Sequence, residues 1–154
     1  MKNSIKILLS IFIVIFLSAC FCKRNTPCTT ETIKNTTWIP LYLEGQSSEI
    51  KTPTENGKCI VFISFDADNK LNGNSGNNLY GGEYSLSKYS EFKTDKLFST
   101  RRMGPNDKYE DIFLKALSET DKVKLEDGKL NFYGKNKLKI SFKKADKNEI
   151  SQAQ

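Results

Sequence analysis

The groups available for acid–base or covalent chemistry are cysteines, carboxylates, lysines and tyrosines, because the sequence contains no histidine. The lack of histidine excludes Ser–His and Cys–His nucleophile pairs, an imidazole general base and the commonest transition-metal ligand. An enzyme would therefore depend on carboxylates, and Glu83, Glu91 and Asp95 are the candidates for a hydrolytic pair. Their spacing is typical of surface charge, and no nucleophile elbow accompanies them. We expect no catalytic residues.

The sequence also lacks the patterns of a metal or cofactor site. The segment that begins with Asp66-Ala67-Asp68 has Leu71 and Asn77 where an EF-hand loop requires glycine and glutamate. No G-x-x-x-x-G-K-[ST] pattern is present to cradle a phosphate. The cysteines lack the paired C-x₂₋₄-C spacing of a zinc site. We therefore expect neither a metal nor a cofactor.

The first twenty residues have the order of a secretory signal, with a basic lead, an apolar middle at residues 7–17 and small residues before Cys20. The apolar run is shorter than the roughly 20 residues that a membrane-spanning helix needs. The tetrapeptide Leu17-Ser18-Ala19-Cys20 resembles the lipobox of bacterial lipoproteins, in which the cysteine carries a thioether-linked diacylglycerol. An ordinary cleaved signal, with Cys20 as the first mature residue, is the alternative. We expect a signal peptide over residues 1–19 and lipidation of Cys20.

The residues after the signal predict an exported, membrane-anchored protein. Residues 20–35 are polar, basic and rich in threonine, which predicts a flexible tether. No acidic residue stands immediately after Cys20, and by analogy with lipoprotein sorting this favours the periplasmic face of the outer membrane. The formal charge of +6 falls to +4 when Lys2 and Lys6 leave with the signal, and the lysines are scattered among acidic residues. Without a clustered basic stripe we expect no nucleic-acid partner.

The other cysteines allow one disulfide if the exported chain is oxidised. Lipidation of Cys20 would leave Cys22, Cys28 and Cys59. A Cys28–Cys59 bridge would join the tether to the start of the domain, and a Cys22–Cys28 bridge is the competing arrangement.

The apolar periodicity predicts strands around one helix. Strands are expected at residues 38–43, 59–65, 81–86 and 92–100, and a closing meander at 123–142 turns at Asp127-Gly128. The Gly- and Asn-rich residues 66–78 predict tight turns, and Trp38 is expected to anchor the core. A helix with a capping-box-like start at Asp107–Glu110 is expected to bury one stripe, consisting of Tyr109, Ile112, Phe113, Ala116 and Leu117.

Several of these segments, in this order, resemble the META domain, also called the HslJ-like domain. The matching segments are Thr37-Trp38, residues 71–84 (LNGNSGNNLYGGEY), residues 99–105 (STRRMGP), Glu110-x-x-Phe113-Leu114-x-Ala116-Leu117 and Gly128-x-Leu130-x-Phe132. The resemblance implies an α+β fold over residues 36–143, a curved, split-barrel-like antiparallel sheet with one packed amphipathic helix. Residues 144–154 are expected to form a disordered tail.

The chain departs from the family pattern at two positions. The family often has cysteine where this chain has Asn77, and a second cysteine where this chain has Gly104-Pro105. The two cysteines are absent together, as expected if they pair in other members. A redox role of that pair is therefore not expected here.

The resemblance also implies a function. Members of the family are often lipoproteins associated with envelope stress and antibiotic tolerance, and no catalytic residues are established for them. We therefore expect a lipid-anchored, non-catalytic envelope protein that binds a protein partner or a hydrophobic ligand. An apolar cleft lined by Tyr80, Tyr84 or Phe92 would favour the ligand. The alternatives are an inhibitor or pilot-type structural lipoprotein and a carboxylate-based hydrolase.

Overall fold

The computed structural model describes residues 28–146 and 148–150. The predicted signal peptide, the predicted lipidation site Cys20 and Cys22 lie outside the described residues. Among those described, no helix is both long and apolar enough to cross a membrane.

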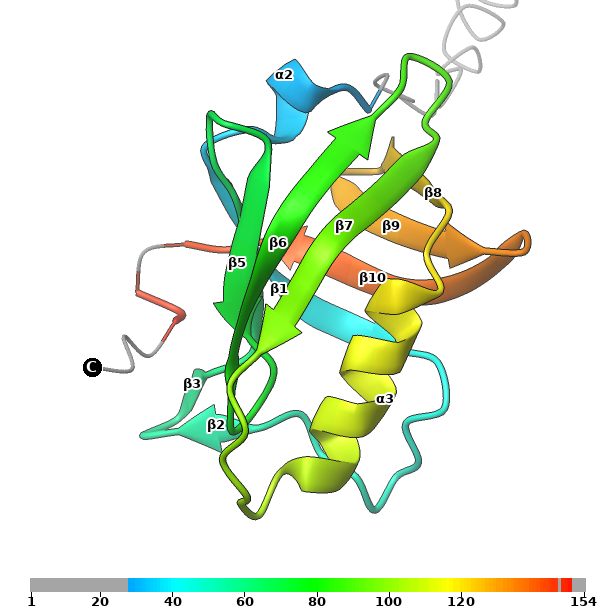
Figure 1. The fold of residues 1–154 in the computed structure, drawn as a ribbon. Coiled ribbons are helices and arrows are strands. Elements are labelled where there is room, and N and C mark those ends of the chain that lie inside the picture. Colours follow the sequence, from blue (N-terminus) through cyan, green and yellow to red (C-terminus); the bar gives the residue numbers. More distant parts are fainter. Residues whose placement is uncertain (1–27, 147, 151–154) are drawn as a thin grey trace, which may run out of the picture.

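The fold is α+β, as predicted, and is built on one antiparallel sheet that curls into a half-barrel (Figure 1). The sheet has eight strands in the order β7-β6-β5-β4-β1-β10-β9-β8. The strands are β1 (Thr36–Leu43), β4 (Phe62–Phe65), β5 (Lys70–Asn74), β6 (Leu79–Leu86), β7 (Phe92–Ser99), β8 (Lys122–Glu126), β9 (Lys129–Gly134) and β10 (Lys137–Lys144).

The closing meander forms as the sequence predicts. Asp127 and Gly128 have φ values of 50° and 74°, and Lys135 and Asn136 have φ values of 51° and 63°. Two successive positive φ values are the mark of the type I′ turn that joins adjacent antiparallel strands. The alternating residues of β9 place Leu130 and Phe132 inside the barrel, where both are buried.

The two edge strands meet at one end of the half-barrel. The backbone N–H of Phe92 in β7 donates to the carbonyl of Asp121, and the N–H of Val123 in β8 donates to the carbonyl of Ser90, both at 2.9 Å. Away from this end the gap between the edges is covered by helix α3 (Asp107–Ser118) (Figure 1).

Helix α3 buries the stripe expected from its sequence. Tyr109, Phe113, Ala116 and Leu117 are buried, and Ile112 is partly buried against the same core. The ring of Phe113 meets that of Phe142 on β10 edge-on, with centroids 6.3 Å apart. The stripe therefore attaches α3 to the concave side of the sheet. Trp38 is buried in the same core, as predicted.

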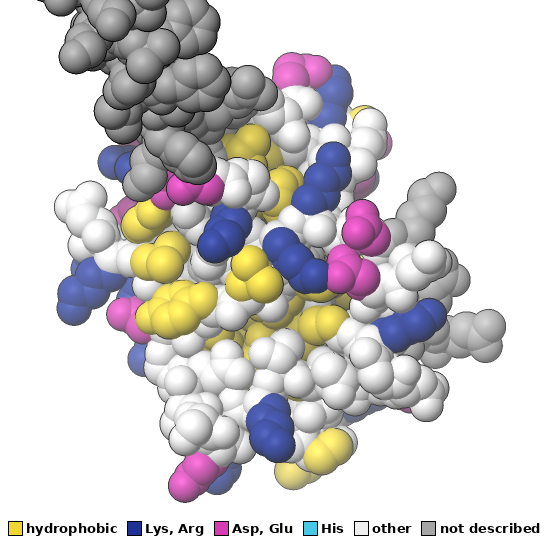
Figure 2. All heavy atoms as spheres, turned by 180° about the vertical axis from the view of Figure 1, so that it is seen from behind, with side chains coloured by type: hydrophobic (Ala, Val, Ile, Leu, Met, Phe, Trp, Pro, Cys, Tyr) yellow, Lys and Arg dark blue, Asp and Glu magenta, His cyan; other side chains and the backbone are white. Residues whose placement is uncertain are grey.

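The opposite, outward face of the sheet is mixed in character. Figure 2, which views the molecule from behind, shows apolar side chains interspersed with lysines, arginines and carboxylates. Strand β1 contributes Leu41 and Tyr42 to the exposed residues, next to a bulge between Pro40 and Tyr42. The sheet thus buries one face and leaves the other to solvent, as antiparallel sheets commonly do.

The strands differ from the prediction in two places. The segment 59–65 is split between β3 (Lys58–Cys59), which pairs with β2 (Thr54–Glu55) outside the main sheet, and β4. The N–H of Ile60 donates to the carbonyl of Pro53 at 3.2 Å, in register with the β2–β3 pairs, so the hairpin pairing continues to Ile60 and pairing with the main sheet begins only at Phe62. Strand β5 lies inside the Gly- and Asn-rich segment expected to form turns, because it pairs with β4 on one side and β6 on the other.

Both ends of the domain extend beyond the limits expected from the sequence. Residues 28–35, assigned to the flexible tether, include helix α2 (Thr30–Ile33), and Cys28 and Ile33 are buried because both are apolar and pack on the core. At the other end, the carbonyl of Glu149 accepts a hydrogen bond from the N–H of Cys59 at 3.1 Å. The Glu149 carboxylate also pairs with Lys143. Residues 148–150 of the expected tail therefore pack on the domain.

Candidate functional site

The most concentrated polar contacts lie where the β5–β6 turn meets the start of α3. The Glu110 side chain is only 8% exposed. Its Oε2 accepts hydrogen bonds from the Ser75 hydroxyl at 2.7 Å and from the backbone N–H groups of Asn77 at 3.2 Å and Asn78 at 3.0 Å. Its Oε1 accepts a further bond from Asn78 Nδ2 at 2.6 Å. A buried carboxylate with this many donors satisfies the turn's polar groups and holds the turn on the helix.

Asn78 extends this network to the segment that leads from β7 to α3. Its Oδ1 accepts from the Thr100 hydroxyl at 2.8 Å and from the N–H of Arg102 at 2.7 Å. Its Nδ2 also donates to the carbonyl of Arg102 at 2.9 Å. Three segments that are remote in the sequence are thereby joined by two side chains, Glu110 and Asn78. We call the set Ser75, Asn77, Asn78, Asp107 and Glu110 the polar clamp.

The capping box expected at Asp107–Glu110 does not form. The residue before the helix is Asn106, which makes no side-chain cap. Asp107 Oδ1 instead accepts from the N–H of Gly104 at 2.9 Å and from Asn77 Nδ2 at 2.6 Å. The carboxylates of Asp107 and Glu110 accept hydrogen bonds from the β5–β6 turn and, for Asp107, from Gly104. Neither is therefore available for the reciprocal side-chain-to-backbone hydrogen bonds of a capping box.

Asn77 and Gly104 are in direct contact, at positions where cysteines were expected from the family pattern to be close. A Cβ built on Gly104 would lie 2.4 Å from Asn77 Oδ1. The same Oδ1 accepts from the N–H of Asn106 at 3.3 Å. Asn77 therefore occupies the space beside Gly104 and replaces a possible covalent link by hydrogen bonds.

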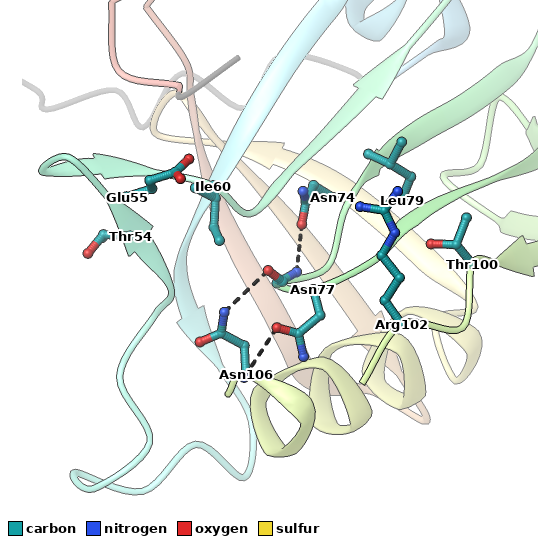
Figure 3. Close-up of a pocket in the computed structure, with 10 residues that line it drawn as sticks. Thr54, Glu55, Ile60, Asn74, Asn77, Leu79, Thr100, Arg102 and Asn106 are labelled. Atoms are coloured by element: carbon teal, nitrogen blue, oxygen red, sulfur yellow. Dashed lines mark hydrogen bonds between the residues drawn. The ribbon is translucent and has the colours of Figure 1, made fainter. Parts of the chain in front are cut away.

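A cleft of about 470 Å³ opens beside the polar clamp (Figure 3). One wall is the β2–β3 hairpin and Ile60, and the other is the β5–β6 turn with the segment between β7 and α3. The side chains that line it include those of Glu55, Ile60, Asn74, Leu79, Thr100 and Arg102. The family motifs at residues 71–84 and 99–105 supply the second wall, but no pattern along the chain predicts the cleft itself.

The three carboxylates considered for hydrolysis do not form a site at this cleft. Glu83 and Asp95 lie opposite each other on β6 and β7, and Glu83 forms an ion pair with Lys96 at 3.0 Å. Glu91 lies at the start of β7, opposite Lys122. None of the three lines the cleft.

The aromatic residues named as possible walls of a ligand cleft are part of the core. Tyr80, Tyr84 and Phe92 are all buried. The ring of Tyr84 packs edge-on against Phe65 at 5.0 Å and stacks with Phe92 at 6.0 Å. The Tyr80 hydroxyl donates to the carbonyl of Phe62 at 3.0 Å. Side chains therefore fill this part of the half-barrel, and the expected aromatic cleft is absent from the described residues.

Cys28 and Cys59, the pair expected to form a disulfide, are both free thiols in the structure. Burial raises the pKa of Cys28 to about 11, against the smaller effect of a hydrogen bond with Thr32. Burial also raises the pKa of Cys59, whose Sγ donates to the carbonyl of Val61 at 3.3 Å. Each thiol is thus held in its own environment, one beside α2 and the other beside the β2–β3 hairpin. The described residues contain no group of three potential metal ligands.

The network could be found in the sequence only in part. Glu110 lies three residues before Phe113 and therefore on the buried side of α3, which is an unusual place for a carboxylate. That position is a signal that Glu110 needs polar partners. Its partners, however, are 32 to 35 residues away along the chain, and no local pattern connects them.

Comparisons with known proteins agree with the fold and the motifs. The fold is similar to that of a protein from Burkholderia xenovorans determined by NMR, with a TM-score of 0.61 and 19% identity over 80% of this chain and 90% of that chain. It is also similar to a DUF4847 family protein from Bacteroides vulgatus in a crystal structure, with a TM-score of 0.56 and 18% identity over 75% of this chain and 98% of that chain. No curated protein matches the chain.

The family comparison covers nearly all of the described residues. The model of the META domain matches residues 31–147, which include every strand of the sheet and both described helices apart from the first residue of α2. The resemblance inferred from the motifs is therefore confirmed. The chain belongs to the META domain family.

Proposed function

We propose that this chain is a bacterial lipoprotein anchored through Cys20, whose META domain is a non-catalytic binding module for a protein partner in the cell envelope. The Leu17-Ser18-Ala19-Cys20 motif supports the anchor, and the family resemblance supports a role in tolerance of envelope stress. The periplasmic face of the outer membrane is the proposed location, on the basis of the residues after Cys20.

The observation that carries the binding role is the cleft beside the polar clamp. The buried carboxylate nearest to it, Glu110, is engaged by four donors within the domain and is therefore poorly placed to act as a base. The clamp also fixes the backbone of the β5–β6 turn and of Arg102, which form one wall of the cleft. A pre-formed cleft with fixed walls suits binding, because little ordering is left to occur when a partner docks.

A protein partner is favoured over a hydrophobic ligand held inside the half-barrel. The interior is occupied by packed aromatic rings, including the contact between Phe92 and Phe132 at 5.2 Å. A ligand would have to displace these side chains and lose their packing energy. The cleft, by contrast, is open at the surface and has both polar and apolar walls.

The anchor is tested by labelling cells with radioactive palmitate and separating membranes from soluble protein. We expect label on the wild-type chain and on Cys22→Ser, which is the matched control, and none on Cys20→Ser. We also expect Cys20→Ser to leave the membrane fraction. Label that persists on Cys20→Ser would contradict the proposal.

The binding role is tested by photo-crosslinking in intact cells with p-benzoylphenylalanine. The probe is placed at Thr54, which lines the cleft, or at Lys129, an exposed residue on β9 outside it. We expect a discrete adduct from position 54 that disappears in an Arg102→Gln background, and no such adduct from position 129. Identical adducts from both positions would contradict partner binding at the cleft.

A further inference from the structure

We propose that the cleft between the β2–β3 hairpin and the polar clamp binds a single carboxylate attached to an apolar group, as at the free C-terminus of a peptide that ends in an aliphatic residue. The inference rests on the proposed binding role and specifies the ligand chemistry of the same cleft. Asn74 and Arg102 would hold the carboxylate, and Ile60 and Leu79 would contact the apolar group.

Asn74 provides a buried donor that faces the cleft without a partner. The residue is buried, with only 7% of its surface exposed. Its Oδ1 accepts from the N–H of Gly76 at 2.7 Å, which fixes the amide so that Nδ2 points away from Gly76. No described residue accepts a hydrogen bond from this Nδ2. The fully enclosed polar atoms without a partner are the hydroxyls of Tyr84 and Tyr109, so Asn74 Nδ2 keeps some access to the cleft that it lines.

A ligand oxygen at Asn74 Nδ2 would therefore satisfy a donor that is otherwise poorly solvated. A fully buried donor without an acceptor costs about 1–3 kcal/mol, and this nearly buried donor would regain part of that free energy from a ligand that brings an acceptor. The requirement is for an acceptor, which excludes an amine or a purely apolar group at this position.

Arg102 provides a positive charge on the same wall. Its backbone is fixed by Asn78, which accepts from the Arg102 N–H and donates to the Arg102 carbonyl. Its side chain extends along the cleft toward Leu79 (Figure 3). Within residues 28–146 and 148–150, no carboxylate forms an ion pair with this guanidinium. A planar guanidinium with parallel N–H groups matches a carboxylate in two-point contact.

The remaining walls define what is attached to the carboxylate and how much charge it carries. Ile60 and Leu79 are apolar, and Leu79 is 54% exposed, so an aliphatic group beside the carboxylate would cover it. Arg102 is the single positively charged side chain among the described residues that line the cleft, so the cleft offers charge compensation for one negative group. The cleft volume of about 470 Å³ lies within the usual range for small-molecule sites. The combination favours a monoanion with an aliphatic neighbour over a phosphate dianion.

The test is an NMR titration of the ¹⁵N-labelled full chain in detergent micelles with N-acetyl-leucine and with its neutral counterpart, N-acetyl-leucinamide. We expect the acid to shift the Asn74 side-chain amide and the Arg102 Nε–H, and to bind at least about tenfold more tightly than the amide. Arg102→Gln should weaken binding of the acid about tenfold, which corresponds to 1.4 kcal/mol. Arg101→Gln is the matched control, because Arg101 does not line this cleft and should leave binding unchanged.

A second pair of probes separates two sources of the same chemistry. Tighter binding of the peptide Ala-Ala-Ala-Ala-Leu than of octanoate would assign the cleft to a protein C-terminus, and the reverse order would assign it to a free aliphatic acid. Equal binding of N-acetyl-leucine and its amide, or an acid response that survives Arg102→Gln, would overturn the inference. Loss of the inference would leave the proposed anchor and crosslinks from position 54 standing, so the two failures are distinguishable.

Discussion

Glu110 contributes more to this domain than its position on a helix would indicate. It is a carboxylate in a row of apolar residues, yet four donors from the β5–β6 turn converge on its two oxygens. All four donors belong to buried or half-buried residues, so water has limited access to replace the carboxylate. Its role is therefore to satisfy the turn, and its loss would leave several polar groups without partners.

Replacing Glu110 by alanine should destabilise the domain severely. We expect Glu110→Ala to lower the free energy of unfolding by about 3 kcal/mol, because each buried donor left without an acceptor carries a penalty. Urea unfolding followed by the fluorescence of Trp38, the single tryptophan, measures the effect. Asp111→Ala, at the next and exposed position, is the control and should cost less than about 0.5 kcal/mol. A cost for Glu110→Ala as small as that for Asp111→Ala would show that Glu110 is dispensable for stability.

The β5–β6 turn and the start of α3 are attached to each other through Asn77 and Gly104. Asn77 donates to Asp107 and accepts from Asn106, and it can do so only because Gly104 has no side chain in the space it occupies. The contact between these two elements therefore depends on the close packing of Asn77 against Gly104 as well as on hydrogen bonds. The effects of substitutions at Asn77 and Gly104 on the free energy of unfolding should therefore depend on each other.

A double-mutant cycle should reveal this coupling. Gly104→Ala alone should cost about 1–3 kcal/mol, since its new methyl group would overlap the Asn77 side chain. In an Asn77→Ala background the same change should cost at least about 1 kcal/mol less, because the overlapping atoms are gone. The free energies of unfolding of the four proteins measure the difference.

A control for that cycle combines Gly104→Ala with Lys129→Ala, an exposed position on β9. Here the two effects should add within about 0.5 kcal/mol. Simple additivity for the Asn77–Gly104 pair would mean that the two side-chain positions do not compete for space.

The elements that could be predicted from the sequence are those with a strong local pattern. The stripe from Tyr109 to Leu117 predicted α3, and the Asp127-Gly128 turn predicted the β8–β9 hairpin. Helix α2 has a single turn, which is too short to show a helical period. Strand β5 has a turn-like composition and is a strand only because β4 and β6 pair with it on both sides.

The candidate site was less accessible to prediction for a related reason. The residues that line the cleft come from the β5–β6 turn, from the segment before α3 and from the β2–β3 hairpin. Asn74 is a candidate binding residue because it is buried and because its Oδ1 accepts from the Gly76 N–H. Neither property can be predicted from the residues next to it in the sequence. Contacts between segments that are distant in the sequence form such a site, and no local sequence pattern specifies these contacts.

For the domain as a whole, the first and last described residues are more firmly attached than their composition indicates. Glu149 pairs with Lys143 and accepts from the N–H of Cys59, and Ile150 forms a bridge with Cys59. These residues cover a thiol that also lies close enough for the Glu149 charge to raise its pKa. Glu149 and Ile150 therefore protect Cys59.

A chain that ends at Asp146 should have a more reactive Cys59. Removing the later residues exposes the thiol and takes away both burial and the Glu149 charge, so the pKa of Cys59 should fall and its thiolate fraction should rise. We expect severalfold faster alkylation by iodoacetamide at pH 8, measured peptide by peptide by mass spectrometry. The rate at Cys28 is the internal control and should not change. An unaltered rate at Cys59 would contradict this protective role.

The burial of Cys28 has a consequence for how the domain would stand at a bilayer. With the anchor at Cys20, as proposed, eight residue steps lead to a point fixed in the core, and an extended chain of that length reaches at most about 29 Å. The end with α2 and the β6–β7 turn would then be turned to the headgroups. The β2–β3 hairpin lies at the opposite end (Figure 1). A linker this short would orient the opening of the proposed carboxylate-binding cleft away from the lipid and toward soluble proteins.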